Sequence, residues 1–201
     1  MSSSSEGYAI ELYMDPALEN QVLKAWNVLA RRQISTELIE IGSRPHITLF
    51  STPFLLEPSK LESLLKSLTS KFDPFSLSFS SISSFSNDNN LLFLSPTPSI
   101  SLLNFHSHLV DAVVKEGIEV SQEFLVGNWI PHCAVAKRVP KQRMSEAFSL
   151  LRDLKLPVQG YAVDVALVQF SPVREIFSFV LVSQTHYMQL ATLIESNHLC
   201  R

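Results

Sequence analysis

Two segments decide the fold of this chain: RPHITLF at residues 44–50 and WIPHCAVA at residues 129–136. Each places Pro-His before a run of apolar and β-branched residues, a composition typical of a β-strand. Residues two apart in a strand share a face, so His46 and Thr48 are expected to point to the same side. The first segment therefore presents an imidazole and a hydroxyl side by side, close enough to contact one phosphate together.

The second segment stands at the matching place of an internal repeat. An offset of 86 residues lays Pro45-His46 on Pro131-His132 without a gap. The same offset matches apolar positions along the chain: Leu64, Leu65 and Leu68 with Leu150, Leu151 and Leu154; Phe75, Leu77 and Phe79 with Tyr161, Val163 and Val165; Phe93 with Phe179. The repeat spans approximately residues 36–96 and 122–183, and it predicts a pseudo-twofold axis that brings His46 and His132 to a common cleft from opposite sides.

Hydrophobic periodicity predicts an alternation of helices and strands. We expect strands at residues 8–14, 36–41, 45–50, 75–85, 91–94, 131–136, 158–170 and 175–183. Helices are expected at residues 16–32, 58–71, 98–116 and 140–154, with a closing helix at 186–198. Because two half-sized units need each other to bury their sheets, residues 1–201 are interpreted as one domain with interleaved lobes, and the Ser-rich residues 1–6 as disordered.

The overall charge limits the class of ligand. The chain has 16 Lys and Arg against 19 Asp and Glu, for a formal net charge of −3. Proteins that track a long nucleic acid use a basic stripe to neutralise phosphates, and none is present. The expected partner is a small nucleotide or the end of an RNA, and the protein is expected to be a monomer.

The cysteines and termini suggest a reducing compartment. Cys133 and Cys200 do not make a disulfide framework, and Cys133 is expected to be buried and inert. The N-terminus lacks the regions of a signal peptide, and no apolar stretch is long enough to span a bilayer. We therefore expect a cytoplasmic or nuclear protein without a membrane partner.

A pair of facing histidines suits phosphodiester cleavage. The nucleophile must lose a proton on one side of the phosphorus, while the leaving oxygen gains one on the other. The unperturbed pKa of histidine is about 6.5, so one ring can act as base and the other as acid near neutral pH. This chemistry needs no metal or cofactor, and neither is expected. The sequence leaves open which histidine plays which part.

These residues resemble a known family. His46-Ile47-Thr48-Leu49 and His132-Cys133-Ala134-Val135 are similar to the paired His-x-Thr/Ser motifs of the 2H phosphoesterases, which include cyclic phosphodiesterases and RNA 2′,5′-ligase-like proteins. The resemblance implies an α+β fold: a single bilobal domain with two antiparallel-type sheets flanking a central cleft and helices outside. It also implies metal-independent activity on cyclic or 2′,5′-linked phosphodiesters, with His46 and His132 as acid and base and Thr48 binding phosphate.

The second motif departs from the family at Ala134, where relatives carry Thr or Ser. An alanine side chain donates nothing, so a charge-assisted hydrogen bond of about 1.5–3 kcal/mol is missing at this position. Two hypotheses follow: a phosphodiesterase with altered activity, or a nucleotide-binding or RNA-end-binding relative that has lost turnover. Because both histidines are present, the enzyme is favoured.

Further candidate residues lie near the ends of the expected strands. Tyr13, Phe50, Trp129, Ser171 and Arg174 are candidates for substrate contact, the aromatic ones by stacking on a base. His106 and His108 fall in an expected helix, where residues two apart face different ways, so they are not expected to ligate a metal together. Both are interpreted as surface residues.

Overall fold

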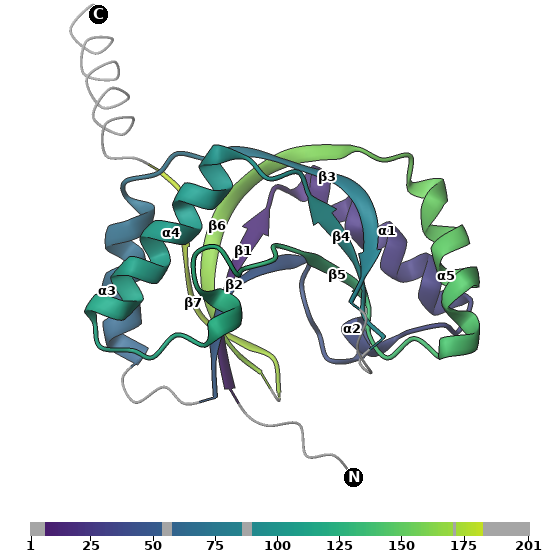
Figure 1. The fold of residues 1–201 in the computed structure, drawn as a ribbon, viewed down its shortest axis with the longest axis horizontal. Coiled ribbons are helices and arrows are strands. Elements are labelled where there is room, and N and C mark those ends of the chain that lie inside the picture. The colour runs from purple at the N-terminus through teal and green to yellow at the C-terminus, as the bar shows by residue number, and fades with distance from the viewer. Residues whose placement is uncertain (1–6, 54–57, 86–89, 171, 183–201) are drawn as a thin grey trace, which may run out of the picture.

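The structure is a computed structural model that describes residues 7–53, 58–85, 90–170 and 172–182. Figure 1 shows the strands lying between two groups of helices, α3 and α4 to one side and α1 and α5 to the other. The strands are β1 (Gly7–Met14), β2 (His46–Thr52), β3 (Phe75–Ser84), β4 (Leu92–Pro96), β5 (Cys133–Ala136), β6 (Val158–Phe170) and β7 (Arg174–Val180). The helices are α1 (Pro16–Arg31), α2 (Glu37–Glu40), α3 (Pro58–Thr69), α4 (Ile100–Lys115) and α5 (Met144–Leu151), with short 3-10 helices at Gln122–Phe124, Lys141–Arg143 and Arg152–Leu154. The disorder expected at 1–6 and the closing helix expected at 186–198 lie outside the described residues.

All seven described strands join one antiparallel sheet, in the order β2-β1-β6-β3-β4-β5, with β7 also paired to β6. The α+β class is confirmed, and the expectation of two separate sheets is corrected. The reason is the length of β6, which runs through both halves of the molecule. One of its edges pairs with β1, while the other pairs first with β3 and then with β7.

The sheet curls so that its two end strands meet. β2 and β5 stand at opposite ends of the strand order, yet they contact each other in space (Figure 1). The twist that strands carry by their handedness accumulates across a sheet and produces this curvature. As a result, the strand that begins at His46 and the strand that begins just after His132 lie side by side.

Local sequence patterns explain the elements that hold this sheet. Asp15 caps α1, accepting hydrogen bonds from the backbone N–H groups of Ala17 and Leu18 at 2.9 and 3.1 Å, and Pro16 occupies the first turn. The apolar stripe expected on the second helix is buried in α3: Leu61, Leu64, Leu65 and Leu68. In β3 the phenylalanines and the leucine face the core, while Ser76 and Ser80 are exposed. Both patterns are confirmed.

One expected strand is a helix. Residues 36–41 include the β-branched Thr36, Ile39 and Ile41, a residue type common in strands, but Glu37–Glu40 forms α2. Burial does not follow a strand pattern either, since Leu38 is buried whereas Ile39 and Ile41 are 45% and 39% exposed. Gly42, with φ of +68°, ends the segment in the left-handed region that glycine adopts without strain.

The predicted repeat is visible only in the order of elements. After β1, each half runs helix, strand, helix, strand, strand if α2 and the 3-10 helices are set aside. Strand pairing differs between the halves, because β4 lies between β3 and β5, whereas β7 pairs with β6 alone among the described strands. The twofold axis and the division into lobes stay predictions. Within the described residues, no helix is both long and apolar enough to cross a membrane.

Candidate active site

His46 is the first residue of β2, and a local hydrogen bond fixes its ring. Its Nδ1 lies 2.6 Å from the backbone oxygen of Arg44, and its side chain is 18% exposed. A carbonyl oxygen only accepts hydrogen bonds, so Nδ1 carries the hydrogen. In the neutral ring Nε2 is then the basic nitrogen, free to exchange a proton with a ligand.

His132 repeats this arrangement one residue before β5. Its Nδ1 lies 2.8 Å from the backbone oxygen of Ile130, again two residues earlier in the chain. The ring is half-buried. Both Pro-His motifs therefore orient their imidazoles by the same kind of hydrogen bond, from Nδ1 to the carbonyl two residues earlier. In both rings, Nε2 is the nitrogen left to exchange a proton with a ligand.

Contacts between β2 and β5 bring the two motifs together. The indole Nε1 of Trp129 donates to the backbone oxygen of Thr48 at 3.0 Å. Burial raises the pKa of the Cys133 thiol to about 12, and the backbone N–H of His46 donates to its sulfur. Cys133 is fully buried, so the expectation of a buried cysteine is confirmed.

Aromatic rings enclose His132. The ring centroids of Phe85 and Phe93 each lie 5.1 Å from that of His132, and the two phenylalanines also contact each other. Burial lowers the pKa of His132, and the charges of His46 and Lys137 lower it further, while the bond to the Ile130 carbonyl opposes the shift. His132 therefore stays neutral to a lower pH than an exposed histidine and is suited to accept a proton.

Acidic and phenolic groups surround His46 instead. The Oε2 atom of Glu11 lies 3.3 Å from Nδ1 of His46 and accepts a hydrogen bond from the Tyr13 hydroxyl at 2.9 Å. Burial, followed by the charge and hydrogen bond of Glu11, raises the pKa of Tyr13. The phenol stays protonated and orients the carboxylate.

Arg44 lies beside Tyr13, on the same side of the site as His46. Its guanidinium lies 4.1 Å from the centre of the Tyr13 ring, 2.9 Å from Glu19 and 3.8 Å from Asp164. Burial raises the pKa of Asp164, and Arg44 opposes that shift. The guanidinium is thus held by two carboxylates on the flank of the site.

The two positions expected to contact phosphate share the face of the histidines but differ in chemistry. Thr48 and Ala134 are half-buried, while their strand neighbours Ile47, Cys133 and Val135 are buried. The alternation predicted for β2 places His46 and Thr48 together. Ala134 offers no side-chain donor, and its backbone oxygen already accepts from the indole of Trp26 at 3.0 Å.

The remaining candidates fall in different places. Phe50 is 1% exposed and part of the core, so its assignment as a substrate contact is wrong: the strand turns that ring inward. Tyr13 is 3% exposed, and its hydroxyl is bound to Glu11, which gives it a supporting place behind His46. Arg174 is exposed on β7, 3.4 Å from Gln169. Ser171 lies outside the described residues.

Trp129 is half-buried, and its indole covers a buried histidine. His106 is 2% exposed, and its ring stacks on the indole at 3.8 Å between centroids and 7° between planes. The expectation that His106 lies on the surface is wrong, whereas His108 is exposed as expected. The described residues contain no group of three or more His, Cys, Asp or Glu that could hold a metal ion.

Sequence reasoning missed Glu11 and His106, although both carry a signal. Glu11 is the one acidic residue in β1, whose other positions are apolar, aromatic or glycine. A lone carboxylate in a strand predicted to be buried indicates a paired group. His106 falls at helical spacing with Leu102, Leu109 and Val113, which form the buried stripe of α4.

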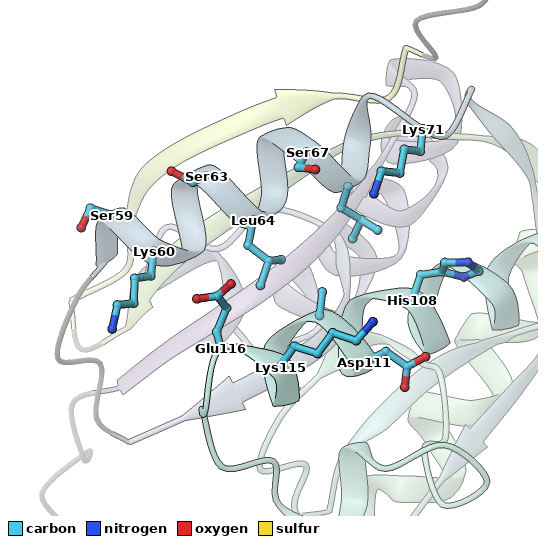
Figure 2. A pocket seen from close by; sticks show the side chains of 12 residues that line it. Ser59, Lys60, Ser63, Leu64, Ser67, Lys71, His108, Asp111, Lys115 and Glu116 are labelled. Atoms are coloured by element: carbon cyan, nitrogen blue, oxygen red, sulfur yellow. The ribbon is translucent and has the colours of Figure 1, made fainter.

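A groove between α3 and α4 lies apart from these residues. It has a volume of about 830 Å³ and is lined by Lys60 of α3, by Lys71 just after that helix, and by Asp111, Lys115 and Glu116 from α4 and its C-terminal end. Figure 2 shows Lys60 and Lys71 on the α3 side and Lys115 on the α4 side. None of the candidate active-site residues lines it.

Sequence comparison places the histidine motifs within a known family. A family model described as the 2′-5′ RNA ligase superfamily matches residues 40–173, which include both motifs. A candidate phosphoesterase of Bacillus licheniformis is 24% identical over 111 residues, covering 54% of this chain and 61% of that protein. The match therefore spans less than two thirds of this relative.

Solved structures share the fold over nearly the whole chain. The structure of E. coli LigT complexed with NADP+ is 12% identical with a TM-score of 0.57, covering 90% of this chain and 100% of that one. TT0787 of Thermus thermophilus is 14% identical with a TM-score of 0.61, covering 89% and 99%. At such identities the likeness establishes the fold alone.

Proposed function

Because this chain belongs to the 2′-5′ RNA ligase superfamily, we propose that it is a phosphodiesterase acting on a cyclic or 2′,5′-linked nucleotide. Membership in this superfamily supports a phosphodiesterase-type function but specifies neither the substrate nor the mechanism. The observation that carries the finer proposal is the matched pair of imidazoles. His46 and His132 lie on contacting segments, and each directs its Nδ1 to the carbonyl two residues before it.

Two such rings can complete a hydrolysis without further groups. One Nε2 takes a proton from the attacking water, whose oxygen bonds to phosphorus. The bond from phosphorus to the ribose oxygen breaks, and the other Nε2 gives that oxygen a proton. Thr48, on the same face as His46, is the proposed donor to a non-bridging oxygen as charge shifts in the transition state.

The proposed substrate is a small nucleotide or the end of an RNA. LigT has been solved in complexes with NADP+ and with 3′-AMP, which are small nucleotide ligands of that protein. The net charge of −3 supports the same size class, because it leaves little basic surface for a long backbone.

The first experiment is turnover of the four nucleoside 2′,3′-cyclic phosphates by purified protein in EDTA. We expect hydrolysis to a nucleoside monophosphate, measured by chromatography of the products. Binding of 2′-nucleotides without turnover would instead support the alternative, a non-catalytic nucleotide-binding or RNA-end-binding protein, which Ala134 favours. Neither turnover nor binding by a folded sample would contradict both hypotheses for small nucleotides.

Ala134→Thr is expected to raise kcat/KM about tenfold, because the new hydroxyl can donate to the bound phosphate as in the family motif. Ala134→Val is the matched control, since valine has the shape of threonine without the hydroxyl. Steady-state kinetics on the best cyclic nucleotide would measure the difference. Equal rates for the two variants would show that no donor is missing at this position.

A further inference from the structure

The two tryptophans of this chain make equivalent hydrogen bonds to the two histidine motifs. The indole Nε1 of Trp129 donates to the backbone oxygen of Thr48 at 3.0 Å. The indole Nε1 of Trp26 donates to the backbone oxygen of Ala134, also at 3.0 Å. Each acceptor stands two residues after the histidine of its motif. One indole therefore holds the third residue of each motif.

The internal repeat does not account for this equivalence. The offset of 86 residues superposes the two acceptor residues. It lays Trp26 on Ala112, and it lays Ser43 on Trp129, so neither indole has a counterpart at the matching place. One tryptophan comes from α1, whereas the other stands just before β5. The same bond is made at both motifs by donors from unrelated places in the chain, so the two acceptors share a need for it.

Both acceptors lie on strands that end the sheet. β2 and β5 stand at the two ends of the strand order, and no ladder pairs them with each other among the described strands. An end strand has one edge whose backbone N–H and C=O groups lack a partner strand. Buried backbone oxygens in folded proteins nearly always have a donor. The two indoles are donors from outside the ladder, one for each end strand.

Trp129 ties the two motifs directly to each other. It stands three residues before His132, and its indole reaches across to the strand that begins at His46. The indole is held on its face, because it stacks on His106 at 3.8 Å between centroids and 7° between planes. The His106 ring is buried and is hydrogen-bonded to the backbone of Leu49. The stacked pair thus holds two consecutive residues of β2.

Trp26 ties the second motif to the core. Its ring is buried on the face of α1 that also buries Leu18, Val22 and Leu29. This helix contacts β6, the strand that runs through both halves of the molecule. Through the indole N–H, α1 holds β5 at Ala134. Each motif therefore has its own anchor outside the strand ladder.

From these two anchors we infer that Trp129 and Trp26 are positioning residues, which set the distance and the orientation of the two imidazoles relative to each other. The inference rests on the proposed function and adds to it the groups that place the two rings. Each imidazole is oriented within its own motif by the bond from Nδ1, so the place of one strand relative to the other remains to be fixed. Trp129 spans that gap. Misplacing reacting groups by about 1 Å can cost roughly 10²-fold in rate.

The test is Trp129→Phe, which keeps an aromatic ring on His106 and removes the N–H. We expect kcat for a cyclic nucleotide to fall about tenfold while KM stays within about twofold of wild type, because the rings are misplaced but the substrate still binds. Steady-state kinetics on protein shown to be folded by circular dichroism would measure both constants. Trp26→Phe should also lower kcat and leave KM in place.

The other kinetic outcomes contradict the inference. A rise in KM with unchanged kcat would make Trp129 a substrate contact and not a positioning residue. Wild-type values of both constants in Trp129→Phe would show that the indole bond does not place the rings. Wild-type values in Trp26→Phe would overturn the assignment of Trp26.

Phe72→Leu is the matched control for the loss of an aromatic ring. Phe72 is half-buried and packs edge-on against Phe105 and His108 of α4, at 5.0 and 5.4 Å between centroids. The variant should lower the free energy of unfolding in urea and leave kcat at the wild-type value, because it touches neither motif. A fall in kcat as large as that of Trp129→Phe would mean that general loosening of the fold lowers the rate, and the inference would be wrong.

A readout without activity separates this inference from the proposed function. In 15N-labelled wild-type protein, both indole protons should exchange with D2O at least about 100-fold more slowly than that of free tryptophan, because each is hydrogen-bonded. In Trp129→Phe the backbone amides of residues 46–49 and 132–135 should exchange faster, while those of α3 stay unchanged. Fast exchange of the Trp129 indole, or unchanged amides in the variant, would overturn the inference. Absence of turnover in wild type would overturn only the proposed function.

Discussion

Replacing His46 or His132 with alanine is expected to lower kcat for a cyclic nucleotide by about 10²–10⁴-fold. Positioned general acids and bases contribute factors of this size, and each ring here is fixed through Nδ1 with Nε2 free. The double variant should be little slower than either single one, because the two proton transfers serve one displacement. Single-turnover and steady-state rates in EDTA would measure these losses.

His108→Ala is the matched control for these variants. That histidine is exposed on α4, and its Nδ1 bonds to the backbone of its own helix at Asn104. Its loss should leave kcat within experimental error of wild type. Wild-type rates in His46→Ala or His132→Ala would remove the basis of the two-histidine proposal.

Acidification is expected to destabilise the fold through His106. Burial lowers the pKa of His106 to about 4, opposed by a hydrogen bond to the Leu49 backbone, and its Nε2 has no partner among the described residues. Below about pH 6.5 the unfolded chain takes up a proton that the folded chain refuses. The folded state therefore loses roughly 3 kcal/mol between pH 6.5 and pH 4 from this ring alone.

His106→Phe isolates this effect because phenylalanine can still stack on Trp129 but cannot be protonated. The variant loses the bond to the Leu49 carbonyl at every pH, at a cost of about 1–3 kcal/mol. Urea denaturation at pH 7 and pH 4 should show a fall in unfolding free energy that is roughly 3 kcal/mol smaller than in wild type. Equal falls in the two proteins would mean that His106 is protonated in the folded state.

Residues 46–49 and helix α3 show what local sequence patterns can predict about this protein. Alternation in residues 46–49 predicted that His46 and Thr48 share a face, and helical spacing predicted the buried leucines of α3. Such patterns depend on the geometry of a single element, with a period of two in strands and 3.6 in helices. The alternation ends after Thr48, because the register between β1 and β2 shifts there and Leu49 and Phe50 are both buried. A strand pattern does not reveal such a shift, so the expected contact of Phe50 with a ligand does not follow from it.

Glu11 shows the opposite case, a residue whose part depends on its neighbours in space. Its position in a buried strand could be inferred from sequence. Its pairing with His46 depends on the register between β1 and β2, in which Tyr13 lies opposite His46 and Glu11 opposite Thr48. Sequence symmetry made the two histidines interchangeable, and these surroundings distinguish them.

The sequence by itself determined most of the helices and strands and the two Pro-His motifs, because each depends on residues close together along the chain. The α+β class followed from the resemblance that those motifs carry. The tertiary structure decided that the described strands join one sheet through β6 and that its end strands, β2 and β5, meet. It also decided that Glu11 lies beside one histidine and phenylalanines beside the other. Strand order, register and the curl of a sheet arise from packing between distant segments, which no local period encodes.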